Sequence, residues 1–114
     1  MEILRDILSV ESAAQAFAAL GSDHRLAVLQ ALVAAGPIGL ATGALAQRVS
    51  MPSSTLSHHL RTLRDAGLVT QERQGRSLIV RAEFDTVDRL SQFLLLNCCA
   101  DASAATSSSD QVPS

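Results

Sequence analysis

The chain has 114 residues, of which 47% are hydrophobic and 18% are charged, and its net charge is −2 at pH 7. This length suits one domain, and the apolar content is enough for one core and too high for a wholly disordered chain. The uncharged stretch Ala31–Gln47 is interrupted by three glycines and Pro37 and falls short of the roughly 20 apolar residues that cross a bilayer, so we expect no membrane span. The N-terminus lacks the plan of a signal peptide, from which we expect a cytoplasmic protein with reduced thiols.

Apolar residues at helical spacing predict a first helix over Val10–Leu20 that ends at Gly21. A second helix follows, for which Ser22 and Asp23 supply the N-cap and Gly36-Pro37 supplies the stop. Its predicted core-facing side chains are Leu26, Leu29, Leu32 and Val33.

Two more helices follow closely in the sequence. Thr42 is placed to cap a short third helix, and Pro52 interrupts the chain before a fourth helix that runs to Gly67. The apolar positions are Leu45, Ala46 and Val49 in the third helix and Leu56, Leu60 and Leu63 in the fourth.

The sequence period changes after the fourth helix. Leu68–Arg73 and Ser77–Ala82 are rich in β-branched residues and flank Gln74-Gly75-Arg76, which predicts a β-hairpin. Helical spacing resumes over Phe84–Cys99, whereas the following Ser, Ala, Thr and Asp residues cannot offset the entropy of ordering. We therefore expect one domain over 1–99 and a disordered, low-complexity tail over 100–114.

This order of elements is typical of a winged helix-turn-helix, a mainly α fold with, here, about five helices plus a two-stranded wing. In that fold the second helix of the motif enters the major groove of double-stranded DNA. The charge distribution favours such a partner, because Arg48–Arg81 holds six arginines against two acids, a net charge of +4, and the rest of the chain carries −6. The alternative is a basic face that is merely solvated.

The fourth helix is the candidate reading helix. On a helical wheel, Ser54, His58 and Arg61 fall roughly 140–200° from Leu56 at the start of the leucine stripe, and Thr55 and Ser57 lie on the flanks. Hydroxyl, imidazole and guanidinium groups donate hydrogen bonds to phosphates and base edges. These five polar residues are therefore candidate DNA contacts.

Arg73 and Arg76 bracket the hairpin turn, from which they can reach phosphates or the minor groove; an ordinary solvated turn is the alternative. His59 falls at the edge of the core, where we expect a packed, hydrogen-bonded imidazole. Neighbouring helical residues diverge by about 100°, so His58 and His59 should not chelate a metal together, and His24 is too distant in sequence to be added to them.

Catalytic motifs are missing from the sequence. It has no Gly-x-Ser-x-Gly, no glycine-rich phosphate loop and no His-Glu-x-x-His, and its glycines fall where turns need them. We therefore expect neither an enzyme nor an obligatory cofactor.

Three stretches together resemble the ArsR/SmtB family of metal-sensing repressors, namely Ser22–Leu26, Ser53–Val69 and Arg73–Arg76. The middle stretch contains Ser-His-His-Leu and ends in Ala-Gly-Leu-Val, and the resemblance covers about residues 10–99. It implies a homodimeric winged-helix repressor that binds an operator and releases it when a toxic ion or a redox signal arrives. Family dimers pair their first and last helices, for which Val10–Leu20 and Phe84–Leu96 are suitably apolar.

The sensor sites of this family lie in different places. The short third helix lacks the Cys-x-Cys of one arsenic site, and Phe84–Cys99 lacks the histidine of a common zinc site. Some arsenic-responsive members carry Asn-Cys-Cys at the end of the last helix, as this chain does at Asn97-Cys98-Cys99, together with a third cysteine that is missing here. The resemblance thus implies Cys98 and Cys99 as the site of a trivalent arsenical inducer, which is methylarsenite, arsenite or antimonite.

Other functions remain open at this point. The two thiols could sense oxidants or reactive sulfur in the same fold. Alternatively, the domain could be a protein-interaction module whose cysteines only pack. Salt-dependent binding to promoter DNA would separate this last alternative from the repressors, because phosphate contacts weaken steeply with salt.

Overall fold

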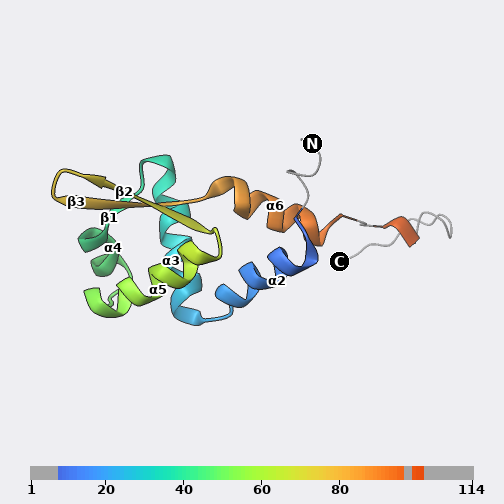
Figure 1. The fold of residues 1–114 in the computed structure, drawn as a ribbon, viewed down its shortest axis with the longest axis horizontal. Coiled ribbons are helices and arrows are strands. Elements are labelled where there is room, and N and C mark those ends of the chain that lie inside the picture. Colours follow the sequence, from blue (N-terminus) through green and yellow to red (C-terminus); the bar gives the residue numbers. More distant parts are fainter. Residues whose placement is uncertain (1–7, 97–98, 102–114) are drawn as a thin grey trace.

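The structure is a computed structural model that describes residues 8–96 and 99–101. Its elements follow the predicted order and form a winged helix-turn-helix (Figure 1). The bounds are α2 Val10–Ala19, α3 Asp23–Ala35, the 3₁₀ turn η1 Gly36–Ile38, β1 Leu40–Ala41, α4 Thr42–Arg48, α5 Ser53–Asp65, β2 Val69–Gln74, β3 Ser77–Ala82 and α6 Phe84–Leu94.

Serine side chains cap the first two of these helices. Ser9 Oγ accepts a hydrogen bond from the backbone N–H of Ser12 (3.0 Å), and Ser22 Oγ accepts one from the backbone N–H of Arg25 (3.3 Å). Each bond satisfies an N–H that has no partner within its helix. The predicted cap at Ser22 is thus confirmed.

The buried face of α3 differs from the predicted one. Val28, Leu29 and Leu32 are buried, whereas Leu26 and Val33 are 43% and 40% exposed. After its first turn α3 is apolar on almost every side, so the spacing alone does not single out one face. Its contacts with α4, α5 and β3 decide which side chains enter the core.

Both ends of α4 differ from expectation. Its N-cap is Ala41, which makes no side-chain hydrogen bond, so the predicted cap at Thr42 is wrong. At its C-terminus Ser50 adopts a left-handed φ of 54°, and the N–H of Met51 donates to a carbonyl in the last turn (3.0 Å), which is a Schellman motif. Met51 is buried and anchors this turn, and Pro52 then occupies the N-cap of α5.

The helix α5 is held along one face and at its C-terminus. Leu56, Leu60 and Leu63 are each at most 2% exposed, as predicted. Gly67, with φ of 79°, ends the helix, and the N–H of the buried Leu68 donates to the carbonyl of Leu63 (2.9 Å). The rotation of α5 about its own axis is therefore fixed by packing.

The sheet has three strands where the sequence predicted two. β3 lies in the middle and pairs antiparallel with both neighbours, with Leu40 of β1 opposite Val80 and Gln74 of β2 opposite Ser77. A strand of two residues is too short to show an alternating pattern. β1 becomes a strand only through its hydrogen bonds to β3, which is distant in sequence.

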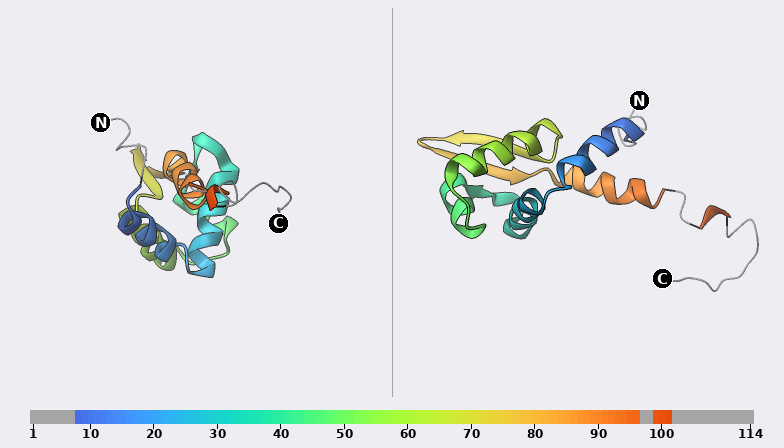
Figure 2. Two further views of the ribbon diagram at one scale, coloured as in Figure 1. Left: turned by 90° about the vertical axis from the view of Figure 1, so that its right-hand side faces the viewer. Right: turned by 90° about the horizontal axis from the view of Figure 1, so that it is seen from below.

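The helices α2 and α6 both extend toward the end of the molecule opposite the hairpin tip (Figures 1 and 2). In α6 only Leu90 is buried, whereas Leu94, Leu95 and Leu96 are 60–69% exposed. No helix among the described residues is both long and apolar enough to cross a bilayer. Of the expected tail, Ala100 and Asp101 are helical and exposed, and residues 102–114 lie outside the described ranges.

Candidate nucleic-acid interface

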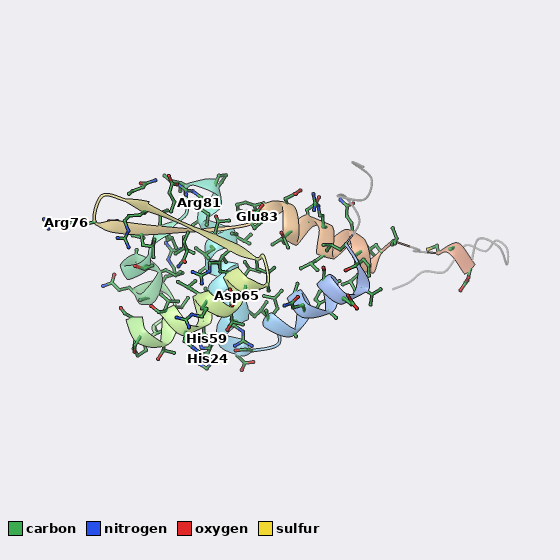
Figure 3. The ribbon with its side chains drawn as sticks, in the orientation of Figure 1. His24, His59, Asp65, Arg76, Arg81 and Glu83 are labelled. Atoms are coloured by element: carbon green, nitrogen blue, oxygen red, sulfur yellow. The ribbon has the colours of Figure 1, made fainter. Side chains whose placement is uncertain are left out.

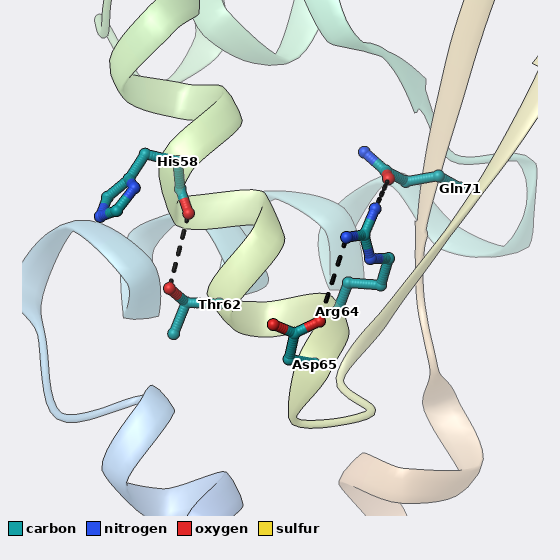
Figure 4. Close-up of polar contacts among 5 residues, drawn as sticks. All are labelled: His58, Thr62, Arg64, Asp65 and Gln71. Atoms are coloured by element: carbon teal, nitrogen blue, oxygen red, sulfur yellow. Dashed lines mark hydrogen bonds and ion pairs between the residues drawn. The ribbon is translucent and has the colours of Figure 1, made fainter.

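The outer face of α5 carries the polar residues that the sequence identified as candidate DNA contacts. Thr62, on the flank, is half-buried, and its hydroxyl donates to the carbonyl of His58 (3.5 Å; Figure 4). The candidate contacts Ser54, Thr55, Ser57, His58 and Arg61 are all exposed. Since the leucine stripe fixes the opposite side of the helix, the outward position predicted for Ser54, His58 and Arg61 is confirmed, and Thr55 and Ser57 on the flanks are exposed as well. Their role in binding DNA stays a prediction.

The hairpin β2–β3 forms the wing and ends in a two-residue loop. Gly75 has a φ of 62° and Arg76 does not share this left-handed conformation, which is the pattern of a type II′ turn. Arg73 and Arg76 are both exposed. Arg76 lies at the tip of the wing, at the same end of the molecule as α4 and the start of α5 (Figures 1 and 3).

The arginines of the basic segment fall into two groups. Arg64 donates to Gln71 Oε1 (3.0 Å) and lies 3.9 Å from Asp65 (Figure 4), and Arg81 donates to acceptors in η1 and β2. Within residues 8–96 and 99–101, four arginines make no hydrogen bond or ion pair, namely Arg48, Arg61, Arg73 and Arg76. An exposed guanidinium without an internal partner keeps all its donors for a phosphate.

Arg48 is the candidate contact to which the sequence reasoning gave no role. It is exposed in the last turn of α4, just before the chain turns into α5. Its charge belongs to the basic segment, but the pattern of apolar residues in the short helix α4 does not show which side of that helix faces outward. The only signal in the sequence was a cation directly before the turn of the motif.

Three histidines meet on the flank of α5. His24, from the first turn of α3, stacks on His59 with ring centroids 5.7 Å apart and planes 5° apart (Figure 3). The ring of His58 lies 5.9 Å from that of His59. Because His24 lies far from His59 in the sequence, sequence reasoning did not predict this contact. His59 is half-buried, as expected of a packed histidine, but its Nδ1 is buried with no hydrogen-bond partner among the described residues.

The surroundings of His59 oppose its protonation. Burial of the ring lowers its pKa, and the charges of Arg25, His24 and His58 lower it further. The part of the chain that the structure describes holds no group of three or more His, Cys, Asp or Glu that could bind a metal ion. This flank is therefore a cluster of packed rings in which the ring of His59 resists protonation.

The predicted thiol site belongs to a different region from the reading helix. Cys98 lies outside the described residues, whereas Cys99 is exposed and has a left-handed φ of 63°. The segment 99–101 follows α6 at the end of the molecule opposite the wing tip (Figure 1). An inducer site at Cys98 and Cys99 stays a prediction.

Sequence comparisons agree with the fold. A helix-turn-helix domain family matches residues 20–72. The HTH-type transcriptional regulator YceK of Bacillus subtilis (strain 168) is 34% identical over 73 residues, which is 64% of this chain and 72% of YceK. The HTH-type transcriptional regulator NmtR of Mycobacterium tuberculosis (strain ATCC 25618 / H37Rv) is 38% identical over 71% of this chain and 64% of NmtR, so the match spans slightly less than two thirds of that relative.

Solved structures extend the likeness to the whole domain. An ArsR-like transcriptional regulator from Rhodococcus sp. RHA1 has a TM-score of 0.68 and 25% identity, with 83% of this chain and 86% of that chain covered. A homodimeric winged helix-turn-helix DNA-binding domain from Mycobacterium bovis, a possible ArsR-family regulator, has a TM-score of 0.62 and 27% identity, with 90% of each chain covered. The chain is therefore a DNA-binding transcriptional regulator rather than an enzyme, and it belongs to the ArsR/SmtB family.

Proposed function

We propose that this protein is a transcriptional repressor that binds operator DNA through α5 and the wing. The observation that carries the proposal is the set of exposed arginines without an internal partner on α4, α5 and the wing. α5 enters the major groove and the wing follows the backbone. The proposed contacts are Ser54, Thr55, Ser57, His58 and Arg61 from α5 and Arg73 and Arg76 from the wing.

The proposed repressor acts as a homodimer paired through α2 and α6. Val10 and the run Leu94–Leu96 are 60–72% exposed, and monomers rarely leave such contiguous apolar surface open. Pairing covers that surface and sets two reading helices about one turn of DNA apart, roughly 34 Å, for a palindromic site. The homodimeric winged helix-turn-helix domain from Mycobacterium bovis supports a homodimer here as well.

Arg76→Ala tests the wing contact. One lost phosphate contact should lower the affinity for promoter DNA and flatten its dependence on salt by about one unit of slope. Fluorescence anisotropy over a range of salt concentrations measures both quantities. Arg25→Ala is the control, because it removes the same charge from α3, outside the proposed DNA contacts and outside the proposed dimer helices. If the salt dependence of Arg76→Ala has the same slope as that of the wild type, the wing does not contact the DNA. If both variants flatten the slope equally, the effect comes from net charge alone.

For the inducer we propose a trivalent arsenical bound by Cys98 and Cys99. Thiolates are soft ligands, and two of them fall short of the four ligands of a structural zinc. Methylarsenite keeps one carbon and offers two exchangeable positions, whereas arsenite or antimonite would retain a hydroxyl or need a further donor. Bridging two neighbouring side chains beyond α6 would distort the chain beside the proposed dimer surface and favour release of DNA. The site requires reduced thiols, as the cytoplasm provides.

Replacing both Cys98 and Cys99 by Ser should leave the affinity for promoter DNA near that of the wild type and abolish release by arsenicals. Parallel titrations of the wild type with methylarsenite, arsenite, zinc and peroxide separate an arsenical sensor from an oxidant sensor. Each single Cys→Ser variant should also lose release by methylarsenite, because the bridge needs both sulfurs. If the double variant releases DNA at the same methylarsenite concentration, the sensor lies elsewhere. Failure of the wild type to bind promoter DNA would favour the protein-interaction module.

A further inference from the structure

The direction of the wing depends on how its base is held. Glu72–Ser77, which make up the outer half of the hairpin, are exposed, whereas Val69, Val80 and Ala82 at its base are buried. The side chains near the tip therefore have little protein around them that could fix their position. The angle between the wing and α5 is set where β2 and β3 meet the rest of the domain.

Arg81 joins three segments at this base. It lies on β3 opposite Thr70, and its Nε donates to the carbonyl of Pro37 in η1 (2.9 Å). Its Nη1 donates to Oε1 of Glu72 on β2 (2.7 Å). Figure 3 shows Arg81 toward the base of the wing, well away from Arg76 at the tip. A planar guanidinium can hold both acceptors at once in a fixed geometry.

The backbone beside the Arg81 side chain is closely packed. Gly39 has a φ of 74°, and a Cβ at this position would lie 2.7 Å from Arg81 Cγ and would collide with the carbonyl oxygen of Val80. The strand β1 follows at once and pairs with β3. The stem of Arg81 is thus confined against the segment from η1 to β1, and its side chain is 29% exposed.

We propose that Arg81 is a positioning residue that sets the angle of the wing and does not itself contact DNA. The inference rests on the proposed contact between the wing and the DNA backbone. Unlike Arg73 and Arg76, Arg81 has its guanidinium bonded to two internal acceptors. Without this bridge the hairpin can swing about its base, so the arginines near the tip meet the phosphates less often.

A double-mutant cycle tests the inference by combining Arg81→Gln with the pair Arg73→Ala and Arg76→Ala. Promoter-DNA affinity is measured against salt, at a temperature at which thermal melts show every variant folded. Arg81→Gln should weaken binding by about 3- to 10-fold in the wild-type background and by less than about twofold in the variant without the wing arginines. Arg25→Gln is the matched control, because Arg25 on α3 also donates from its Nε to a backbone carbonyl, that of Ala19, and belongs neither to the proposed DNA contacts nor to α6. It should stay within about twofold of the wild type.

Glu72 offers a second way to break the bridge, from a side chain that is 57% exposed. Glu72→Ala should weaken DNA binding as Arg81→Gln does, whereas Glu72→Gln, which keeps an acceptor oxygen, should restore most of the affinity. Equal losses for Arg81→Gln in both backgrounds, with the salt slope lowered by about one more unit, would show direct phosphate contact and overturn the inference. Unchanged affinity in both backgrounds would also overturn it. If the wing pair itself leaves binding unchanged, the proposed wing contact fails, and this inference fails with it.

Discussion

At the scale of single residues, the local spacing of the sequence predicts which side chains are exposed better than it predicts which side chains contact one another. The outward position of Ser54, His58 and Arg61 follows from the leucine stripe of α5 alone. The stacking of His24 on His59 and the bond from Arg81 to Pro37 each join segments that are distant in sequence. No local pattern encodes such contacts, because they exist only once α3, α5 and the wing have packed together. Sequence reasoning therefore found the exposed candidate contacts but not the residues that support them.

The environment of His59 predicts that the folded protein becomes less stable as the pH falls. Burial, followed by the charges of Arg25, His24 and His58, lowers the pKa of His59 below the ordinary value of 6.5. As the pH falls below 6.5, the unfolded chain takes up a proton that the folded chain accepts only at lower pH, so the stability of the fold decreases through this window. The melting temperature of the wild type should therefore fall between about pH 7.5 and about pH 5.5.

His59→Gln should flatten this dependence on pH. His58→Gln is the control, because it removes an exposed imidazole from the same helix and leaves His59 in place, and it should retain most of the decrease. Differential scanning fluorimetry at several pH values compares the three proteins. A slope for His59→Gln equal to that of the wild type would assign the acid sensitivity to other groups.

At the scale of elements, a helix with one clear apolar stripe is predictable and a helix without one is not. α5 has only one face that can be buried, so the candidate site on its other face could be read from the sequence. α3 is apolar on nearly all sides, and its tertiary contacts bury Val28, whereas the predicted Leu26 and Val33 remain exposed. β1 has too few residues to carry a pattern and depends on β3 for its hydrogen bonds.

The close approach of the segment between η1 and β1 to the wing predicts a large cost for Gly39→Ala. Gly39 has φ of 74° and ψ of −167°, a region that is essentially restricted to glycine, and the new Cβ would meet the backbone of Val80. We expect a loss of about 2–4 kcal/mol in the free energy of unfolding. This corresponds to a decrease of roughly 10–20 °C in melting temperature.

Gly43→Ala is the matched control for this substitution. Gly43 lies inside α4, and an added Cβ would have no atom within 4 Å. Since alanine favours the helix over glycine, this variant should unfold at the wild-type temperature or be up to about 1 kcal/mol more stable. Urea titrations at constant temperature provide the two free energies. Equal stabilities for Gly39→Ala and Gly43→Ala would mean that the base of the wing relaxes around the new methyl group.

At the scale of the whole molecule, the proposed DNA surface and the exposed apolar surface lie at opposite ends. The wing tip, α4 and the start of α5 share one end, and α2 and α6 extend toward the other (Figures 1 and 2). The segment 99–101 follows α6 at this second end. A ligand there would have no direct contact with DNA. It would therefore act on DNA binding indirectly, through α6 or through the proposed pairing of two chains.

The proposed pairing of two chains through α6 can be tested by placing a single charge on that helix. The wild type should have a mass in solution of twice the 12.0 kDa of one chain at roughly micromolar concentration, measured by light scattering after size exclusion. Leu94→Glu places a carboxylate on a residue that is 69% exposed in the single chain, and burying that charge in the interface should reduce the mass to that of a monomer. Ile38→Glu changes a residue that is 77% exposed on η1, which is not part of the proposed dimer surface, and should remain dimeric. Because one reading helix alone lacks the gain of simultaneous binding to two half-sites, the monomer should bind promoter DNA about 100-fold more weakly or worse. A dimer that survives Leu94→Glu would move the interface away from the end of α6, and a monomeric wild type with tight DNA binding would contradict the dimer itself.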